Sequence, residues 1–104
     1  MATALTDMAT RAKAKKSRLR LRLYVAGHAP NSLQAIANAK AICDEHFASA
    51  HELEIVDLLE HPLRALADGI IVTPTLLKLL PLPAGRVIGN LSDTDQVLLT
   101  LGGP

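Results

Sequence analysis

Apolar and polar residues alternate from about Ser17 to Val25, and this period of two is typical of a strand with one face in the core. The opposite face is expected to lie in water. The alternation therefore predicts that Leu19, Leu21, Leu23 and Val25 are buried and that Arg18, Arg20, Arg22 and Tyr24 are solvated.

A turn over residues 26–32 separates this strand from a helix. Pro30 ends the strand, and the side chain of Asn31 or Ser32 is suited to cap the helix by accepting a hydrogen bond from a free backbone N–H. The spacing then changes to three and four residues, which predicts a helix to about Phe47 with one apolar stripe: Leu33, Ile36, Ala39, Cys43 and Phe47. Because Cys43 lies in this stripe, we predict a buried small hydrophobe rather than a reactive thiol.

Residues 53–59 predict a second strand, mostly apolar and interrupted by Glu54 and Asp57. A strand, a helix and a second strand joined by a right-handed crossover form a parallel pair. The first half of the chain therefore predicts an α/β fold. No period of 20 to 50 residues repeats along the chain, which argues against a solenoid.

The second half begins with patterns that favour more than one element. Residues 62–68 predict a short helix that Gly69 ends, and residues 70–72 are strand-like. Residues 73–80 fit two structures, a short helix with Pro74 in its first turn or an extended segment with Pro74 at a bend. Propensity does not separate these two structures.

The last part of the chain is also ambiguous. Val87-Ile88 predicts a short strand that is stopped by Gly89-Asn90, a pair suited to positive φ. A helix capped by Ser92 and ended by Gly102 would follow. However, residues 97–101 also have the length and apolar content of a buried strand.

Composition limits the classes of protein that these elements can build. The chain has 104 residues, 49% of them hydrophobic, which supplies one core but not two. No apolar run is long enough to span a membrane, and one cysteine excludes an internal disulfide. Tyr24 and Phe47 are the only aromatic residues, so the stacking platform of single-strand nucleic-acid binders is missing.

The charge is divided unevenly along the chain. The formal total is +1, but residues 1–22 hold seven basic residues against Asp7 alone, and the remainder is acidic. We therefore predict a basic flexible leader over 1–17 and a domain over 18–104, the leader being suited to a phosphate-rich or acidic partner. The leader has no apolar core of a secretory signal, and its composition also fits an organellar transit peptide.

Five motifs and a lysine occur in order between residues 20 and 101: Leu21-Arg22-Leu23-Tyr24-Val25-Ala26-Gly27, Pro30-Asn31-Ser32, Thr73-Pro74-Thr75-Leu76, Lys78, Leu80-Pro81 and Ile88-Gly89-Asn90-Leu91-Ser92. In this order and spacing the set resembles the KaiB family of circadian-clock proteins. The resemblance implies a thioredoxin-like α/β fold with a βαβ N-terminal half. It also implies a C-terminal half with two arrangements, βααβ in the ground state and αββα in the thioredoxin-like state, with Pro74 cis in the latter.

The same resemblance implies a function without catalysis. It implies a cytoplasmic regulator that binds a KaiC-like hexameric ATPase and modulates its phosphorylation and ATPase cycle. KaiA or a histidine-kinase sensor domain would be a further partner, and the chain would form a homotetramer or dimer. The resemblance places partner-binding basic residues at Arg22, Lys78 and Arg86. The residues also fit a thioredoxin-like interaction domain that feeds a kinase or stress-signalling pathway without an oscillator.

Gly89 and Asn90 match the region that biases the fold switch in the family. The family more often has Asp at the second position, so Asn90 removes a charge there. Because Ala is strained at positive φ, we expect Gly89→Ala to shift the population toward the thioredoxin-like form.

The sequence gives little support to an enzyme. A thioredoxin-type oxidoreductase needs Cys-x-x-Cys at the start of its first helix, and the corresponding turn reads Ala29-Pro30-Asn31-Ser32. The four histidines, at positions 28, 46, 51 and 61, lack a ligand spacing such as His-x-x-x-His, and no nucleotide-binding glycine motif occurs. We therefore predict a protein without catalytic residues, metal or cofactor.

Overall fold

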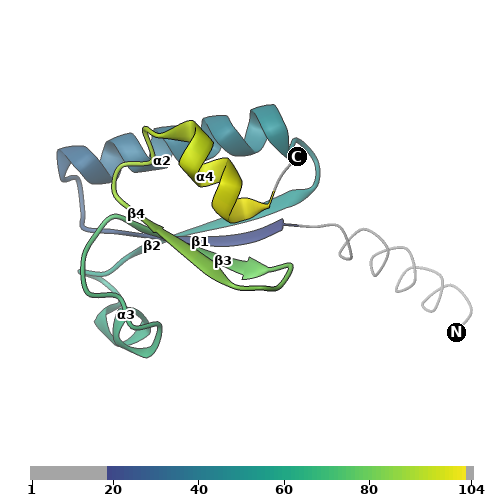
Figure 1. Cartoon of the computed structure of the whole chain (residues 1–104). Helices are drawn as coiled ribbons and strands as arrows, with labels where there is room; N and C mark the ends of the chain where they lie inside the picture. Colours follow the sequence, from purple (N-terminus) through teal and green to yellow (C-terminus); the bar gives the residue numbers. More distant parts are fainter. Residues whose placement is uncertain (1–18, 103–104) are drawn as a thin grey trace, which may run out of the picture.

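The chain folds as a four-stranded sheet with helices on both of its faces (Figure 1). The computed structural model describes residues 19–102, so the predicted leader and the end of the predicted domain lie outside the described residues. The elements in chain order are β1 (Leu19–Val25), α2 (Pro30–His46), β2 (His51–Asp57), α3 (Pro62–Ala67), β3 (Thr75–Leu80), β4 (Gly85–Ile88) and α4 (Thr94–Leu101).

The strand order is β2-β1-β3-β4. β1 pairs in parallel with β2, as the crossover predicted, and antiparallel with β3, which in turn pairs antiparallel with β4. α2 and α4 lie together on one face of the sheet, and α3 lies on the other (Figure 1). The second half of the chain thus has the αββα order that the resemblance implies for the thioredoxin-like state.

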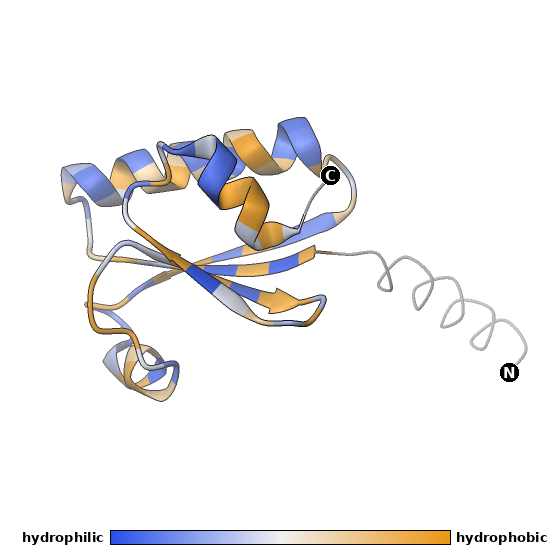
Figure 2. Cartoon of the chain, viewed as in Figure 1, coloured by the Kyte–Doolittle hydropathy of each residue, from blue (hydrophilic) through white to orange (hydrophobic). Residues whose placement is uncertain are grey.

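The main core is aliphatic and lies between the sheet and the layer of α2 and α4. All four residues predicted for the inner face of β1 are buried, and they pack with side chains from both helices, among them Ala39 and Val97. The alternation of hydrophobic and hydrophilic residues is visible along β1 in Figure 2. Cys43 belongs to this core, which confirms its predicted burial.

The prediction for the other face of β1 is wrong at Tyr24, which is completely buried. Tyr24 belongs to a second, smaller core with Val56, Ala65 and Leu77, beneath α3. The alternation along β1 predicts the buried face correctly, but it carries no information on whether a later segment covers the polar face. α3 covers only the end of that face where Tyr24 lies.

Between α3 and β4, the structure contradicts one predicted element and decides between two alternatives for another. Residues 70–72 form a loop and not a strand, and the side chain of Ile71 is 92% exposed. Gly69, with φ +69°, turns the chain immediately before this loop. Residues 75–80 are extended, so the strand is the correct alternative, and the Thr73–Pro74 peptide is cis as the resemblance implied.

The start of α2 also differs from its prediction. Ala29 occupies the N-cap position, and no side chain caps the helix. Ser32 is instead buried, and its Oγ accepts a hydrogen bond from the backbone N–H of Ala26 at 3.0 Å, which fixes the turn after β1. Leu33 is half exposed and not part of the buried stripe, whose first members are Ser32 and Ala35.

At α4, the helix and not the strand is the correct alternative for residues 97–101. Gly102 adopts the left-handed conformation at φ +77° and ends the helix, as predicted. The predicted cap is off by one residue, because Asp93 Oδ1, and not Ser92, accepts the hydrogen bond from Gln96 N at 3.1 Å.

Replacing Asp93 with alanine is expected to lower the free energy of unfolding by about 1 kcal/mol, because the N–H of Gln96 loses its acceptor. Urea denaturation followed by circular dichroism measures this change. Ser92→Ala is the matched control, and we expect it to leave the free energy within about 0.5 kcal/mol of the unmodified chain. A larger loss for Ser92→Ala than for Asp93→Ala would contradict this assignment of the cap.

Candidate partner-binding surface

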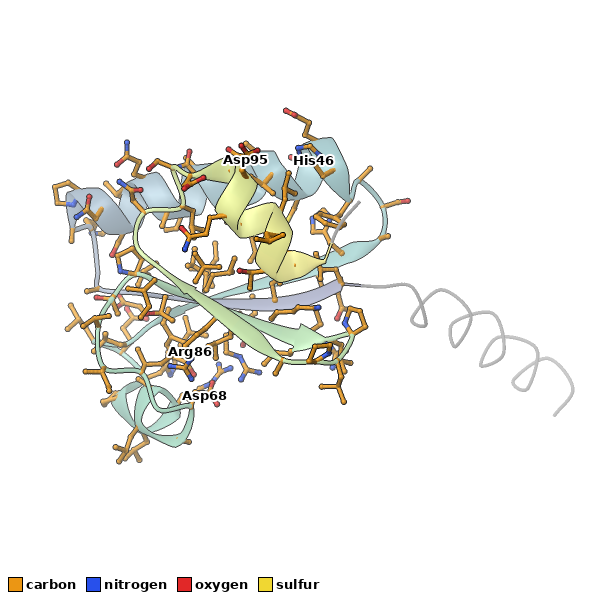
Figure 3. All side chains as sticks on the ribbon, in the orientation of Figure 1. His46, Asp68, Arg86 and Asp95 are labelled. Atoms are coloured by element: carbon orange, nitrogen blue, oxygen red, sulfur yellow. The ribbon has the colours of Figure 1, made fainter. Side chains whose placement is uncertain are left out.

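Two of the three basic residues that the resemblance singled out converge at the C-terminal end of α3. Arg22 comes from β1 and Arg86 from β4, at positions far apart in the sequence. Both reach the residues that follow α3, Asp68 and Gly69. Figure 3 shows Arg86 and Asp68 beside each other on the α3 side of the sheet, whereas His46 and Asp95 lie in the opposite layer.

The guanidinium of Arg22 bridges two carboxylates. Its Nε lies 2.8 Å from Oε1 of Glu54, its parallel neighbour on β2, and its Nη1 lies 2.9 Å from Oδ2 of Asp68. The second oxygen of Glu54, Oε2, lies 2.8 Å from Nη2 of Arg64 on α3. Tyr24 donates from its hydroxyl to Asp68 Oδ2 at 2.6 Å, and this hydroxyl also lies 3.0 Å from the carbonyl oxygen of Arg64.

Arg86 binds backbone instead of a carboxylate. Its Nη2 lies 3.2 Å from the carbonyl oxygen of Asp68, and its Nη1 lies 3.3 Å from that of Gly69. These carbonyls follow the last turn of α3, where a cation stabilises the helix end. We call Arg22, Tyr24, Glu54, Arg64, Asp68 and Arg86 the α3 polar cluster.

The contacts of the cluster shift the pKa values of its members in consistent directions. The hydrogen bond from Tyr24, followed by that from Arg22, lowers the pKa of Asp68. The hydrogen bond from Arg22, with a further one from Arg64, lowers the pKa of Glu54. Burial, followed by the hydrogen bond to Asp68, raises the pKa of the Tyr24 phenol. The charged carboxylates and the neutral phenol are therefore the stabilised forms.

Lys78 lies on the other face of the sheet from this cluster. It is only 6% exposed, and its Nζ would lie 3.5 Å from a Cβ placed on Gly102, at the end of α4. A cation near the C-terminal end of a helix stabilises that helix. Because Lys78 lies on the opposite face of the sheet, the structure does not bring it together with Arg22 and Arg86. The contact of Lys78 with a partner stays a prediction.

Large exposed aliphatic side chains lie on α3 and in the loop that follows. Leu63 is 78% exposed and Leu66 76%, and they share one side of α3 because they are three residues apart. Ile71 is still more exposed. We call Leu63, Leu66 and Ile71, together with Arg86, the α3 surface. The sequence indicates that such a surface must exist, because a helix of six residues cannot bury leucines and alanines on all of its sides.

Gly89 and Asn90 connect β4 to α4, and Asn90 holds this turn against α2. Its backbone oxygen accepts a hydrogen bond from Asn38 Nδ2 at 2.8 Å, and its Nδ2 donates to Gln34 Oε1 at 3.0 Å. Gly89 has φ +120° in this arrangement. Because Gly89 has a positive φ in the thioredoxin-like form, Gly89→Ala strains this form as well. The predicted shift toward the thioredoxin-like form therefore requires that the substitution strain the ground-state arrangement more.

A thioredoxin-type oxidoreductase has its two thiols at the start of the first helix, where this chain has Ala29 and Ser32. The hydroxyl of Ser32 accepts a hydrogen bond from the backbone N–H of Ala26 in the preceding turn. The one cysteine, Cys43, is 1% exposed in α2. Burial raises the pKa of its thiol to about 11. Since the thiolate is the reactive form, Cys43 is unsuited to nucleophilic or redox chemistry.

At pH 8 we expect Cys43 in the folded protein to react with iodoacetamide at least roughly a hundredfold more slowly than in urea, because the raised pKa depletes the thiolate and burial restricts access. Mass spectrometry of the alkylated chain over time measures both rates. Equal rates in the two conditions would contradict the burial of Cys43.

Within residues 19–102, no group of three or more His, Cys, Asp or Glu side chains is arranged to hold a metal ion. Over the same residues, no helix combines the length and the hydropathy that crossing a membrane requires.

Comparison with known proteins identifies the family. The KaiB domain model matches residues 22–102, which is most of the chain. The chain belongs to the KaiB family. Its curated relatives include the circadian clock protein KaiB3 of Synechocystis, 49% identical over 85 residues that cover 82% of this chain and 83% of KaiB3. The circadian clock oscillator protein KaiB of Synechococcus elongatus is 47% identical over 78% of this chain and 79% of its own length.

Solved structures show that this KaiB-family chain has a thioredoxin-like fold. Chloroplastic thioredoxin z superposes with a TM-score of 0.70 at 18% identity, covering 92% of this chain and 86% of that one. The N-terminal domain of Synechococcus elongatus SasA superposes with a TM-score of 0.68 at 24% identity, covering 83% and 85%. The fold class inferred from the resemblance is thereby confirmed, with a KaiB-type sequence on a thioredoxin-like backbone.

Proposed function

We propose that this chain is a non-enzymatic regulator that binds a KaiC-like hexameric ATPase and modulates its phosphorylation and ATPase cycle. The observation that carries the proposal is the match to the KaiB family over residues 22–102. The αββα order of the second half supports it, because this is the order of the thioredoxin-like state, and the family resemblance implies that the ATPase is bound in that state.

The absence of catalysis is supported by the chemistry at the start of α2. Ala29 has no nucleophile, Ser32 is buried and hydrogen-bonded, and Cys43 lies inside the core with a raised pKa. A regulator with this structure acts through its binding energy alone. An insulin-reduction assay is expected to show no activity, and activity that disappears in Cys43→Ser would overturn this part of the proposal.

The α3 surface is the part of the described chain that best fits a protein partner. Leu63 and Leu66 expose apolar area on one side of α3, and exposed apolar area of this kind commonly marks interaction sites. Arg86 adds a cation whose described hydrogen bonds go to neutral carbonyls, so its charge is available to an acidic group on the partner. We propose that Leu63, Leu66 and Ile71 supply the apolar contact and that Arg86 supplies the charged one.

Binding is tested by mixing the chain with a purified KaiC-type hexamer in the presence of ATP or ADP and following co-elution. The proposal predicts a complex that contains both proteins. Failure to bind any KaiC-type ATPase of the source organism would overturn the proposal and leave the interaction domain of a kinase or stress pathway as the remaining function. KaiA and a histidine-kinase sensor domain are further partners to test on the preformed complex.

A further inference from the structure

α3 is held to the sheet by one buried apolar side chain and by several polar contacts. It has six residues, and Ala65 is the only one of them that is buried. Its two leucines point away from the sheet into solvent. An isolated helix of this length is unstable in water, so its position depends on the groups that tie it to its neighbours.

These ties meet at Asp68, the residue that follows the last turn of α3. Its Oδ2 is shared by the Tyr24 hydroxyl at 2.6 Å and Arg22 Nη1 at 2.9 Å, and its carbonyl oxygen accepts from Arg86. Arg64 and Glu54 add an ion pair between α3 and β2. The α3 polar cluster therefore connects the helix to β1, β2 and β4, three strands of the sheet.

We propose that Asp68, with Tyr24 and Arg22, is the latch that docks α3 on the sheet and thereby positions the α3 surface for its partner. These three are positioning residues, since they are mostly covered and do not supply the exposed leucines themselves. The claim that this latch affects partner binding rests on the proposed function. The docking of α3 on the sheet is a property of this chain alone.

The latch requires charged carboxylates and a neutral phenol. Asp68 and Glu54 have lowered pKa values, so their contribution to docking is complete above the ordinary carboxyl range and is lost as the pH falls below it. Tyr24 has a raised pKa, so its contribution is complete below about pH 10 and is lost as the pH rises further. The hydrogen bonds of Arg22 to Glu54 and Asp68 raise the pKa of its guanidinium, so it stays charged throughout this range.

Amide hydrogen exchange measures the docking of α3 without any partner. The reporters are the N–H groups of Asp68, Gly69 and Ile70, which donate to carbonyl oxygens of α3. In Asp68→Asn we expect these amides to exchange about tenfold faster or more, because a charge-assisted hydrogen bond is lost at a partly buried site. Amides of α2 are expected to exchange as in the unmodified chain. Glu60→Gln removes an exposed carboxylate near α3 and is the matched control.

Tyr24→Phe tests the same latch with a smaller change, because it removes only the hydroxyl. We expect faster exchange of the same three amides, in the same direction as for Asp68→Asn. The phenol of Tyr24, the only tyrosine, is also titrated by its absorbance. Its pKa is expected to fall in Asp68→Asn relative to the unmodified chain, because the variant loses the charge and the carboxylate acceptor of Asp68 and exposes more of the phenol if α3 undocks.

Unchanged exchange at positions 68–70 in both variants, or an unchanged phenol titration in Asp68→Asn, would overturn the latch. Equal acceleration in Glu60→Gln would overturn it as well.

If the exchange results are as expected and the unmodified chain binds a KaiC-type hexamer, Asp68→Asn should weaken that binding and Asp68→Glu should restore part of it. If the unmodified chain binds no such ATPase, the proposed function fails while the exchange results still decide the latch.

Discussion

Replacing Leu63 and Leu66 together with serine is expected to weaken binding to a KaiC-type hexamer by roughly a hundredfold. Each leucine is more than three-quarters exposed in the free chain, so most of its apolar area is available to a partner. Burial of a leucine contributes about 1.5–3 kcal/mol, and two such losses exceed the roughly 2.7 kcal/mol that correspond to a hundredfold. The equilibrium dissociation constant, measured with a labelled chain and the hexamer, gives the result.

The same double variant should fold normally, because exposed side chains contribute little to stability. Leu82 and Leu99 provide a matched control, as both are exposed leucines that lie outside α3 and its following loop. Leu82→Ser with Leu99→Ser should leave the dissociation constant within about threefold of the unmodified value. Equal losses for the two pairs would contradict the assignment of the partner contact to the α3 surface.

Replacing Tyr24 with alanine is expected to lower the free energy of unfolding by about 3–5 kcal/mol. The side chain is completely buried between the sheet and α3, and the variant loses both the packed ring and the hydrogen bond to Asp68. Tyr24→Phe keeps the ring and should lower the free energy by only about 1–2 kcal/mol. Urea denaturation of the two variants separates these contributions.

Arg20→Ala serves as the control for Tyr24→Ala. Arg20 lies on β1 with its side chain exposed and pairs with Glu52 at 2.9 Å, so its loss should change the free energy of unfolding by no more than about 1 kcal/mol. A similarly small change for Tyr24→Ala would mean that the polar face of β1 is solvated along its whole length, as the alternation alone predicted.

Local pattern was a good guide wherever one element meets the main core. The alternation along β1, the parallel pairing with β2 and the left-handed glycine after α4 were all predicted from neighbouring residues. The pattern was least informative over residues 70–80. A short apolar run fits a strand, a helix or a loop equally well, and the choice depends on pairing with β1, which is distant in the sequence.

The candidate site could be predicted only in part. Arg22 and Arg86 came from the family resemblance, but nothing local to them indicated that they meet at Asp68. Tyr24 was assigned to solvent because the covering helix lies about 40 residues further along the chain. The family resemblance also groups Lys78 with the two arginines, whereas its position in β3 directs its side chain to the opposite layer.

The central claim is that this KaiB-family chain binds a KaiC-like hexameric ATPase. Size-exclusion chromatography with light scattering tests it most directly, on the hexamer alone and on its mixtures with the unmodified chain and the Leu63→Ser, Leu66→Ser double variant. We predict a peak heavier than the hexamer for the unmodified chain in ATP or ADP, and a peak at the mass of the free hexamer for the double variant. A mixture with the unmodified chain that elutes as separate hexamer and free chain in both nucleotides would contradict the claim.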